Sequence, residues 1–281
     1  MSYSWLITGA SSGLGAATAL AALKAGHKVV AGARNPSKAS EAYSEIEQNG
    51  GTWLKLDVSA ADAEPVTAKA VKEHGVNVLV NNAGYALRGA LEDFSEAEIH
   101  DQMETNFFGP LRTIKGALPY FRAQKAGTII NISSTSGVTG FPGFSLYAAS
   151  KFALEGASES LYGELAPFGI RVLVVQPGAF RTNFQGAGTG PALSKTYLGT
   201  TVDTILQRVI GNGGKERGDP DRAAKAIVEA VTYEGDGKAT RDLLRLPLGE
   251  DALARAKAKT DDFSGNVDRV KHIAQSAVFP A

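Results

Sequence analysis

Short apolar runs separated by helical segments recur along the chain and mark the strands that we expect. The run from Val76 to Val80 is nearly continuous in apolar residues, as is typical of a strand buried on both faces of a sheet. Gly127 to Ser133 has the same character. The other expected strands are Ser4 to Thr8, Lys28 to Ala33, Thr52 to Leu56, Ile170 to Val175 and, last along the chain, Asp242 to Leu248.

Helical segments lie between these strands, and several have recognisable ends. The first runs from about Gly13 to Ala25. Ser95 to Glu98 forms a capping box, which opens a helix that runs towards Gln124. Further helices are expected around Tyr147, from Val202 to Ile210, after Asp219-Pro220 and from Gly249 to Lys259.

A proline interrupts the helix that the capping box opens. Pro110 has no backbone N–H, so it cannot donate to the carbonyl of Asn106, four residues earlier. We expect a kink at this point. Two interpretations of the freed carbonyl remain open, because it can hold an ordered water or simply be solvated.

The composition fits a soluble globular protein with one α/β domain or two smaller ones. Hydrophobic residues make up 43% of the 281 positions, which is ample for a buried core, and charged residues make up 21%. Lys and Arg number 29, as do Asp and Glu, so the formal net charge is zero. This balance gives no sign of a nucleic acid, an anionic membrane surface or a polyacidic substrate as partner.

Residue types that are missing exclude further kinds of chemistry. There is no cysteine, which rules out a disulfide framework, a thiolate nucleophile and a Cys-ligated metal site. The four His are scattered without metal-ligand spacing, so we expect no metal. A strand-like run begins by Trp5 and no apolar run is long enough for a bilayer, so we expect no signal peptide and no membrane span. The cytosol is the simplest compartment.

A glycine-rich loop joins the first strand to the first helix. It contains Gly9, Gly13 and Gly15, which allow a tight turn and let backbone N–H groups approach a phosphate at the helix N-terminus. The spacing, G-x-x-x-G-x-G, departs from the G-x-G-x-x-G fingerprint of the commoner dinucleotide fold. A glycine-rich turn that holds no ligand is the alternative interpretation.

The end of the second expected strand indicates which dinucleotide would bind. In NAD-binding units an acid that takes the ribose 2′-OH lies about twenty residues beyond the glycines. Here that position is Arg34 (34 − 15 = 19), and no Asp or Glu occurs between Gly15 and Ser40. A guanidinium can pair bidentately with a 2′-phosphate, which favours NADP(H) over NAD(H). An exposed arginine that opens a helical turn is the alternative.

Side chains at two further strand ends suit the remainder of a nucleotide. Asp57 follows the third expected strand, and its carboxylate could accept a hydrogen bond from an adenine amino group. The fourth strand ends in Asn81-Asn82-Ala83-Gly84, where side-chain amides could stabilise a loop and leave room for a ribose. An ordinary Asn-rich turn is the alternative for this segment.

The candidate for catalysis is a tyrosine and a lysine four residues apart. Tyr147 and Lys151 would project from one face of a helix, where the ammonium can lower the phenol pKa from about 10 and make the phenol a proton donor and acceptor. Ser134, at the end of the fifth strand, could reach a substrate oxygen that the phenol also reaches. Alone, such a pair is more often a surface pair.

Together these segments resemble the short-chain dehydrogenase/reductase family from about Trp5 to Val231. The residues that carry the resemblance are Thr8 to Gly15, Asp57, Asn81 to Gly84, Asn106, Ser134, Tyr147 to Lys151, Pro177-Gly178 and Thr182. It implies an α/β fold of the Rossmann type, doubly wound, with a mainly seven-stranded parallel sheet and helices on both faces. We therefore expect one domain over residues 1–281.

The resemblance also assigns catalytic roles. Tyr147 would exchange a proton with the reacting oxygen, and Ser134 would polarise the carbonyl. Lys151 would hydrogen-bond the nicotinamide ribose and depress the pKa of Tyr147, and Asn106 would support a water in the proton relay.

The cofactor that the resemblance implies is NADP(H). The pyrophosphate would lie against Gly9, Leu14 and Gly15, and the carboxamide of the nicotinamide against Phe180 and Thr182. Many NADP(H)-preferring members carry a basic residue just before the second glycine of the loop, where this chain has serine. The whole expected cofactor shell is Gly9, Ser11, Ser12, Gly13, Leu14, Gly15, Arg34, Asp57, Val58, Asn82, Ala83, Gly84, Tyr147, Lys151, Pro177, Gly178, Phe180 and Thr182.

The last third of the chain contains a glycine-rich segment and a tail. Residues 183–218 hold eight glycines, and we interpret this irregular segment as a lid over an apolar substrate. Lid residues that could close over the substrate are Phe184, Leu193, Tyr197 and Leu198, and the opposite wall could contain Phe141, Phe144 and Tyr85. Each could equally be ordinary core. The extension at about 260–281 could cover the pocket, join a partner subunit or fray.

The function that we expect is NADP(H)-dependent interconversion of a ketone or aldehyde and an alcohol on a mid-sized hydrophobic molecule. Two other functions remain open: a dinucleotide-binding regulatory or scaffold protein without turnover, and an enzyme that reduces a C=N bond or epimerises an alcohol. By analogy with the family, we expect a homodimer or homotetramer formed through the helices that contain Asn106 and Tyr147.

Overall fold

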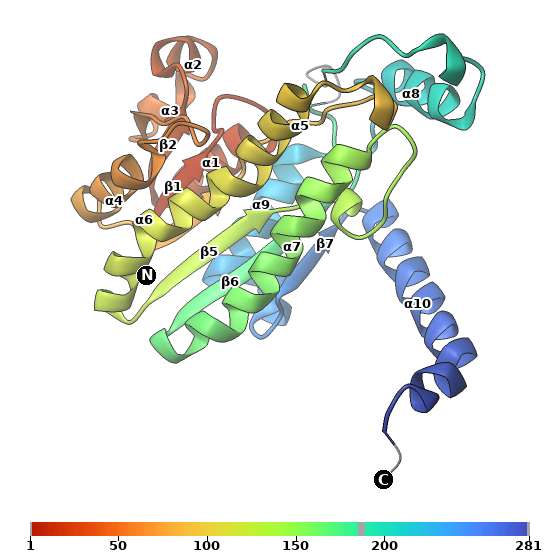
Figure 1. Cartoon of the computed structure of the whole chain (residues 1–281). Helices are drawn as coiled ribbons and strands as arrows, with labels where there is room; N and C mark the ends of the chain where they lie inside the picture. The colour runs from red at the N-terminus through yellow and green to blue at the C-terminus, as the bar shows by residue number, and fades with distance from the viewer. Residues whose placement is uncertain (1, 185–188, 280–281) are drawn as a thin grey trace.

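Seven parallel strands form one sheet, in the order β3-β2-β1-β4-β5-β6-β7, within residues 2–184 and 189–279, the parts of the chain that this computed structural model describes (Figure 1). The strands are β1 (Ser4–Thr8), β2 (Lys28–Ala33), β3 (Thr52–Lys55), β4 (Val78–Asn81), β5 (Gly127–Ile132), β6 (Ile170–Pro177) and β7 (Arg245–Leu248). Each expected strand is present, and β1 and β2 have the expected bounds. The predicted Rossmann-type α/β fold is confirmed.

Helices connect the strands and continue beyond the last one. They are α1 (Gly13–Lys24), α2 (Pro36–Ala42), α3 (Glu45–Gln48), α4 (Ala63–Glu73), α5 (Glu96–Met103), α6 (Gly109–Gln124), α7 (Ser145–Leu165), α8 (Thr201–Gly211), α9 (Pro220–Thr232) and α10 (Glu250–Ser276). Figure 1 shows that helices cover both faces of the sheet.

Alternate side chains of each strand enter two separate cores. Ile7 belongs to the core that packs against α1 and α9, whereas its neighbour Leu6 packs on the opposite face with residues of α4, α6 and α7. Both side chains are fully buried. A strand covered by helices on both faces needs apolar residues at successive positions, which explains the nearly continuous apolar runs.

Buried amides tie the centre of the sheet to the helices of one face. Asn81 on β4 donates through Nδ2 to Oδ1 of Asn131 on β5 at 2.8 Å, and Nδ2 of Asn131 donates to the Ser158 hydroxyl on α7 at 2.8 Å. The Thr113 hydroxyl on α6 donates to Oδ1 of Asn81. Because a buried polar group without a partner is destabilising, this network specifies how α6 and α7 lie against the sheet.

The winding of the chain reverses at β1. This strand pairs with β2 on one side and with β4 on the other, so the connections leave it in opposite directions. In doubly wound sheets a crevice opens at the carboxyl ends of the strands beside such a reversal, and ligands bind there.

The helix predicted from Ser95 towards Gln124 is interrupted. Ser95 caps α5 with the predicted capping box, because its hydroxyl accepts from the Glu98 N–H while the Glu98 carboxylate accepts from the Ser95 N–H. A π-helical turn, η2 (Glu104–Phe108), then separates α5 from α6 and contains Asn106. Such turns are frequent at functional sites. A water on the Asn106 carbonyl stays a prediction.

α10 differs most from its prediction. We expected this helix to end at Lys259, but it continues to Ser276 and projects from the body of the molecule (Figure 1). Only its start packs closely, where Ala252 is buried. The sequence Ser264-Gly265-Asn266 has low helix propensity, which concealed the continuation. Within the described ranges, no helix has the length and apolar character needed to cross a membrane.

Candidate active site

A cleft of about 1300 Å³ lies at the carboxyl ends of the strands. Ligand pockets usually measure roughly 300–1,000 Å³, so this cleft has room for more than one small molecule. Of the predicted catalytic and cofactor residues, all except Gly15 and Asn106 line it. The structure therefore brings together residues from positions 9 to 182 of the chain.

Tyr147 stands on the first turn of α7 and is buried, with 6% of its surface exposed. Its ring centroid lies 5.8 Å from that of Phe184. Burial raises the pKa of Tyr147 to about 12, although a hydrogen bond with Ser134 and the charge of Arg88 oppose this rise. The predicted lowering of this pKa is wrong here, because the removal of water from the phenolate outweighs the hydrogen bond of Ser134 and the charge of Arg88.

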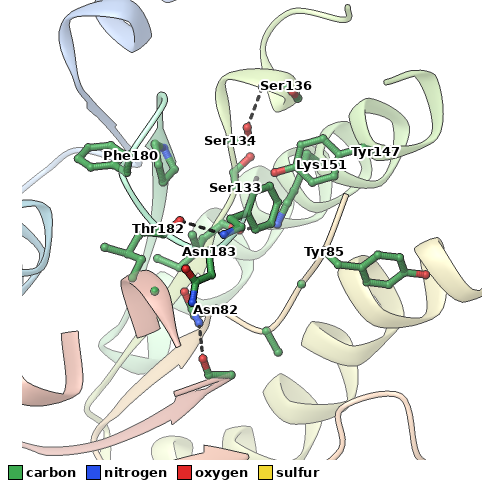
Figure 2. A pocket seen from close by; sticks show the side chains of 18 of the residues that line it. Asn82, Tyr85, Ser133, Ser134, Ser136, Tyr147, Lys151, Phe180, Thr182 and Asn183 are labelled. Atoms are coloured by element: carbon green, nitrogen blue, oxygen red, sulfur yellow. Dashed lines mark hydrogen bonds between the residues drawn. The ribbon is translucent and has the colours of Figure 1, made fainter. Parts of the chain in front are cut away.

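Lys151 lies one turn further along α7, on the same side as Tyr147, as its spacing predicted (Figure 2). Its Nζ is 5.8 Å from the Tyr147 ring centroid and donates to the Ile132 carbonyl at 2.8 Å. Burial lowers the pKa of Lys151 to about 8, and the charge of Glu155 opposes this lowering. An ammonium has three N–H groups, so two are left for a ligand.

Ser134 directly follows β5 and caps the short turn η3 (Thr135–Gly137). Its Oγ accepts a hydrogen bond from the Ser136 N–H at 3.1 Å, which fixes the position of the oxygen. Figure 2 shows Ser134, Tyr147 and Lys151 near one another in the cleft. Two hydroxyl donors thus meet at one place, as the stabilisation of a developing alkoxide requires.

Asn106 lies beneath the cleft and is completely buried. Its side chain holds the backbone of Tyr85 at both ends, because Oδ1 accepts from the Tyr85 N–H at 3.1 Å and Nδ2 donates to the Tyr85 carbonyl at 2.9 Å. Nδ2 also donates to the Ser150 hydroxyl at 3.1 Å. The side chain therefore positions the loop after β4, and any contribution to a proton relay would come from its backbone carbonyl.

The glycine-rich loop lies tightly against the end of β4. Gly9 has a φ of +64°, and a Cβ there would lie 2.8 Å from the Cα of Ala83. Asn82 Nδ2 donates to the carbonyls of Thr8 and Gly9 at 3.0 and 3.1 Å. A Cβ on Gly15 would collide with this amide, so Gly15 serves close packing of the loop and not direct lining of the cleft.

The start of α1 suits the pyrophosphate of a dinucleotide. The N-cap residue, Ser12, makes no side-chain hydrogen bond to α1, and the first turn carries no acidic residue. The N–H groups at the start of α1 are thus available to an anion, which the helix dipole also favours. The residues present fit the pyrophosphate of a nicotinamide dinucleotide.

Arg34 and Asp57, which lie just after β2 and β3, both line the cleft. Arg34 is exposed, and no carboxylate of the described residues pairs with it. Oδ1 of Asp57 accepts from the N–H and the hydroxyl of Ser59 at 3.0 and 2.7 Å, which orients the carboxylate. These positions agree with the predicted placement of both residues, and their roles toward a nucleotide stay predictions.

Another part of the cleft is lined by a cluster of apolar side chains. Phe141, Phe144, Phe184 and Tyr85 line it, together with Ile205 and Val209 of α8. Leu193, Tyr197 and Leu198 are not among the described residues that line it, so their predicted role over the substrate is not supported. The glycines at 186 and 188 of the predicted lid lie outside the described residues, and residues 260–279 do not line the cleft.

Arg88 is a buried residue beside the site that the sequence did not single out. Its guanidinium carbon lies 5.8 Å from the Phe144 ring centroid, and Nη2 donates to the Phe184 carbonyl at 3.4 Å. It therefore contacts two aromatic residues next to Tyr147. Sequence alone offers no signal for it, since a single arginine after the Asn-Ala-Gly loop resembles any surface charge.

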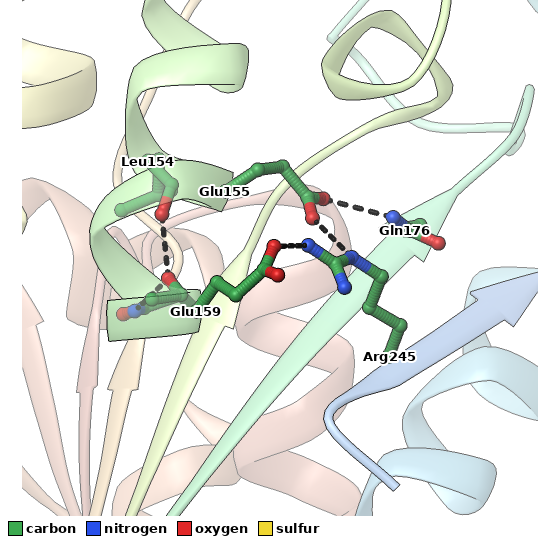
Figure 3. A network of polar contacts seen from close by, with 7 residues as sticks. Leu154, Glu155, Glu159, Gln176 and Arg245 are labelled. Carbon is green, nitrogen blue, oxygen red and sulfur yellow. Dashed lines mark hydrogen bonds and ion pairs between the residues drawn. The ribbon is translucent and has the colours of Figure 1, made fainter. Parts of the chain in front are cut away.

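A second group that the sequence did not single out is the polar network around Glu155, whose charge raises the pKa of Lys151 (Figure 3). Glu155, one turn beyond Lys151, accepts hydrogen bonds from Gln176 Nε2 and from Arg245 Nε, both at 2.9 Å. Arg245 also pairs with Glu159 at 2.6 Å. Only 7% of the Glu155 side chain is exposed. Spacing on α7 could have indicated Glu155, but not Arg245, which is 90 residues away.

A model of the short chain dehydrogenase family matches residues 4–189 of the chain. Among curated proteins, the oxidoreductase claN of Passalora fulva is 72% identical over 218 residues, which are 77% of this chain and all of that protein. The residues that the family model matches include the glycine-rich loop and the segment with Ser134, Tyr147 and Lys151.

Solved structures have the same architecture. The crystal structure of a short-chain dehydrogenase from Streptomyces avermitilis has a TM-score of 0.88 and 36% identity, and covers 99% of this chain and 100% of that one. An alcohol dehydrogenase from the archaeon Thermococcus sibiricus, complexed with 5-hydroxy-NADP, has a TM-score of 0.68 and 27% identity, over 88% of this chain and 96% of that one.

Proposed function

The chain belongs to the short-chain dehydrogenase/reductase family of oxidoreductases, and from that premise we propose that it uses NADP(H) to interconvert a carbonyl compound and an alcohol. The substrate would be a ketone or aldehyde of mid-sized, hydrophobic character. The observation that carries this proposal is the meeting of Ser134, Tyr147 and Lys151 in a cleft that also contains the start of α1. The apolar lining at the other end supports a hydrophobic substrate.

Tyr147 acts as the acid in the reductive direction. With a pKa of about 12 it is protonated at neutral pH and can give its proton to the substrate oxygen. Ser134 donates a hydrogen bond to the same oxygen and stabilises the charge that develops there. The bound nicotinamide supplies or accepts the hydride.

Positive charges compensate for the proton that Tyr147 gives away. The phenolate forms beside the Lys151 ammonium and within the field of Arg88, both of which favour the charged form. Both Lys151 and Tyr147 are buried, so these interactions are stronger than they would be in water. Lys151 also has N–H groups free for the ribose of the nucleotide.

Arg34 makes NADP(H) the preferred cofactor. Its exposed guanidinium lines the cleft at the end of β2, where it can reach a 2′-phosphate. The relative from Thermococcus sibiricus, with its 5-hydroxy-NADP, supports this choice. NAD(H) is the less favoured alternative, because no carboxylate follows β2 to receive a ribose hydroxyl.

The protein would work as a homo-oligomer in the cytosol. The outer face of α7 combines the small residues Ala149 and Gly156 with Phe152, whose side chain is 43% exposed. Phe108, next to α6, is also 44% exposed. Such a face suits the helix of a second copy. Sedimentation of the purified protein tests this, and a purely monomeric profile would remove the proposal.

Cofactor consumption tests the activity. Purified protein is mixed with NADPH or NADH and a panel of ketones and aldehydes graded in size and polarity. Tyr147→Phe should lower kcat by about 10²- to 10⁴-fold and leave NADPH binding intact. Tyr162→Phe is the matched control, because Tyr162 lies on the same helix with a partly exposed ring and should change little.

Each outcome of this test separates two interpretations. Turnover that collapses only in Tyr147→Phe supports the proposed function. Tight NADPH binding without turnover of any carbonyl would favour a non-catalytic dinucleotide-binding protein, and product analysis would reveal C=N reduction or epimerisation. A preference for NADH would refute the role given to Arg34.

A further inference from the structure

The apolar end of the cleft is bounded by α8 and by the start of α10. Phe144 is buried with Tyr147, and Phe141 and Phe184 pack against them. Residues of α8 complete this apolar surface. A substrate whose carbonyl lies at Tyr147 would extend toward this end, because the glycine-rich loop occupies the other.

The contacts of the first turn of α10 fix the position of Arg255 over this apolar surface. Oδ2 of Asp251 accepts a hydrogen bond from the Ala179 N–H at 3.0 Å, and Ala252 is buried, so the first turn is fixed against the end of β6. One turn later, the guanidinium carbon of Arg255 lies 4.2 Å from the centroid of the Phe141 ring. This is a cation–π contact, and it leaves the N–H edges of the guanidinium free.

No counter-ion meets this guanidinium in the described parts of the chain. The acids nearest in sequence are engaged elsewhere, since Asp251 holds Ala179 and Glu250 pairs with Arg217 at 3.0 Å. Glu216 also lines the cleft, but no ion pair joins it to Arg255. Arg208 of α8 lines the same cleft, again without an ion pair among the described residues. Two guanidinium groups thus line the cleft beside the apolar surface, and the cleft lining also includes Lys215 and the Glu216 carboxylate.

We propose that Arg255 is a specificity-determining residue that recognises a carboxylate on an otherwise apolar carbonyl substrate. A planar guanidinium stacked on an aromatic ring presents two parallel N–H donors, which match the two oxygens of a carboxylate. Arg208 lines the same cleft and adds a second positive charge to it. The inference rests on the proposed function, because the anion is taken to belong to the molecule whose carbonyl reacts at Tyr147.

Binding of a matched pair of compounds tests this inference without requiring turnover. Calorimetry compares naphthalene-2-carboxylate with the uncharged naphthalene-2-carboxamide, each titrated into the protein saturated with NADPH. The wild type should bind the carboxylate about tenfold more tightly than the amide. Arg255→Gln should abolish this preference, and Arg255→Lys should keep part of it, since the charge remains but the planar fork is lost.

Arg269→Gln is the matched control. Arg269 lies on the same helix, is exposed and does not line the cleft, so its loss removes an equal charge without changing the preference. Equal affinities for the two compounds in the wild type, no binding of either, or a preference that survives Arg255→Gln would overturn the inference.

The same titrations distinguish this failure from a failure of the proposed function. A preference for the carboxylate in a protein that consumes no NADPH with any carbonyl would refute the activity and leave the anion site in place. Turnover of neutral ketones by a protein without that preference would refute the anion site alone.

Discussion

The two walls of the cleft are built differently. The inner wall, which carries Ser134, Tyr147 and Lys151, consists of strand ends and the start of α7, and Tyr147 and Lys151 are buried. The outer wall, formed by α8 and the start of α10, carries Val209 and Arg255. α8 has no buried residue, although it is strongly amphipathic in sequence. The inner wall is therefore part of the hydrophobic core, whereas the outer wall packs on the surface of that core.

This difference separates chemistry from substrate choice. Proton transfer requires donors fixed within a fraction of an ångström, which a parallel sheet with helices on both faces provides. Substrate choice requires a surface that can vary without loss of the fold, and an exposed helix provides that. Changes to the inner wall should thus affect catalysis and stability together, and changes to the outer wall should affect selectivity alone.

Lys151→Met should give the largest effect, with opposite signs for activity and stability. Loss of the ammonium should lower kcat by about 10²- to 10³-fold, because the phenolate of Tyr147 loses its neighbouring charge. Burial disfavours the ammonium, so its removal should raise the free energy of unfolding by ~1–3 kcal/mol at pH 7. The loss of its hydrogen bond to the Ile132 carbonyl should offset part of this gain. Urea unfolding and steady-state kinetics measure both.

The pH dependence of this gain gives a check on its cause. The pKa of Lys151 is lowered from 10.5 to about 8 in the folded protein, so the unfolded chain binds more protons between these values. Wild-type stability should therefore rise through this range, and the advantage of Lys151→Met should disappear by about pH 11, above the pKa of the unfolded chain. Lys72→Met, on the exposed surface of α4, should change neither property. A stability gain that persists at high pH would mean that burial of charge is not its source.

Arg34→Ala should give the next largest effect, confined to one cofactor. The KM for NADPH should rise by about 10- to 100-fold, because a charge-assisted contact with the 2′-phosphate is lost. The KM for NADH should stay the same within about twofold, since it has no phosphate there. Steady-state kinetics with both cofactors provide the internal control. An equal rise for both would show that Arg34 supports the loop and does not select the cofactor.

The sequence predicted the inner wall far better than the outer wall, and the reason is local. A strand buried on both faces must be apolar, and Tyr147 and Lys151 must be one helical turn apart, so short windows of sequence contain these features. Arg255 and Arg88 acquire their positions only through packing of distant segments. The pKa of Tyr147 was predicted in the wrong direction for the same reason, because burial does not follow from spacing.

Glu155→Gln should change the inner wall more gently, through its effect on Lys151. The carboxylate of Glu155 raises the pKa of Lys151 against burial, so its neutralisation should let Lys151 lose its proton at a lower pH. The alkaline fall in NADPH-dependent reduction should then move toward lower pH, with a loss of about three- to tenfold at pH 8. A pH–rate profile measures this.

Glu159→Gln provides the matched control for that profile. Glu159 pairs with the same arginine, Arg245, but is exposed and lies one turn further from Lys151. Its neutralisation should leave the pH of the alkaline fall in the pH–rate profile unchanged. Equal movement of this fall in both variants would assign the effect to Arg245 or to general loosening of α7 and not to the charge of Glu155.

A valine-to-alanine substitution in each wall should have the smallest effects, and it compares the two walls most directly. Val175→Ala, at a fully buried position on β6, should lower the free energy of unfolding by about 1.5–3 kcal/mol, because it leaves a cavity in the core. Val209 is half-buried on α8, so Val209→Ala should lower the free energy of unfolding by less than about 1 kcal/mol. Instead, the KM of Val209→Ala should change about two- to threefold for bulky ketones and remain constant for small ones, because Val209 packs on the apolar cluster of Phe144 and Tyr147, which a bulky substituent would fill. If Val209→Ala destabilised the protein as much as Val175→Ala, the outer wall would belong to the core, and its independence from the inner wall would be refuted.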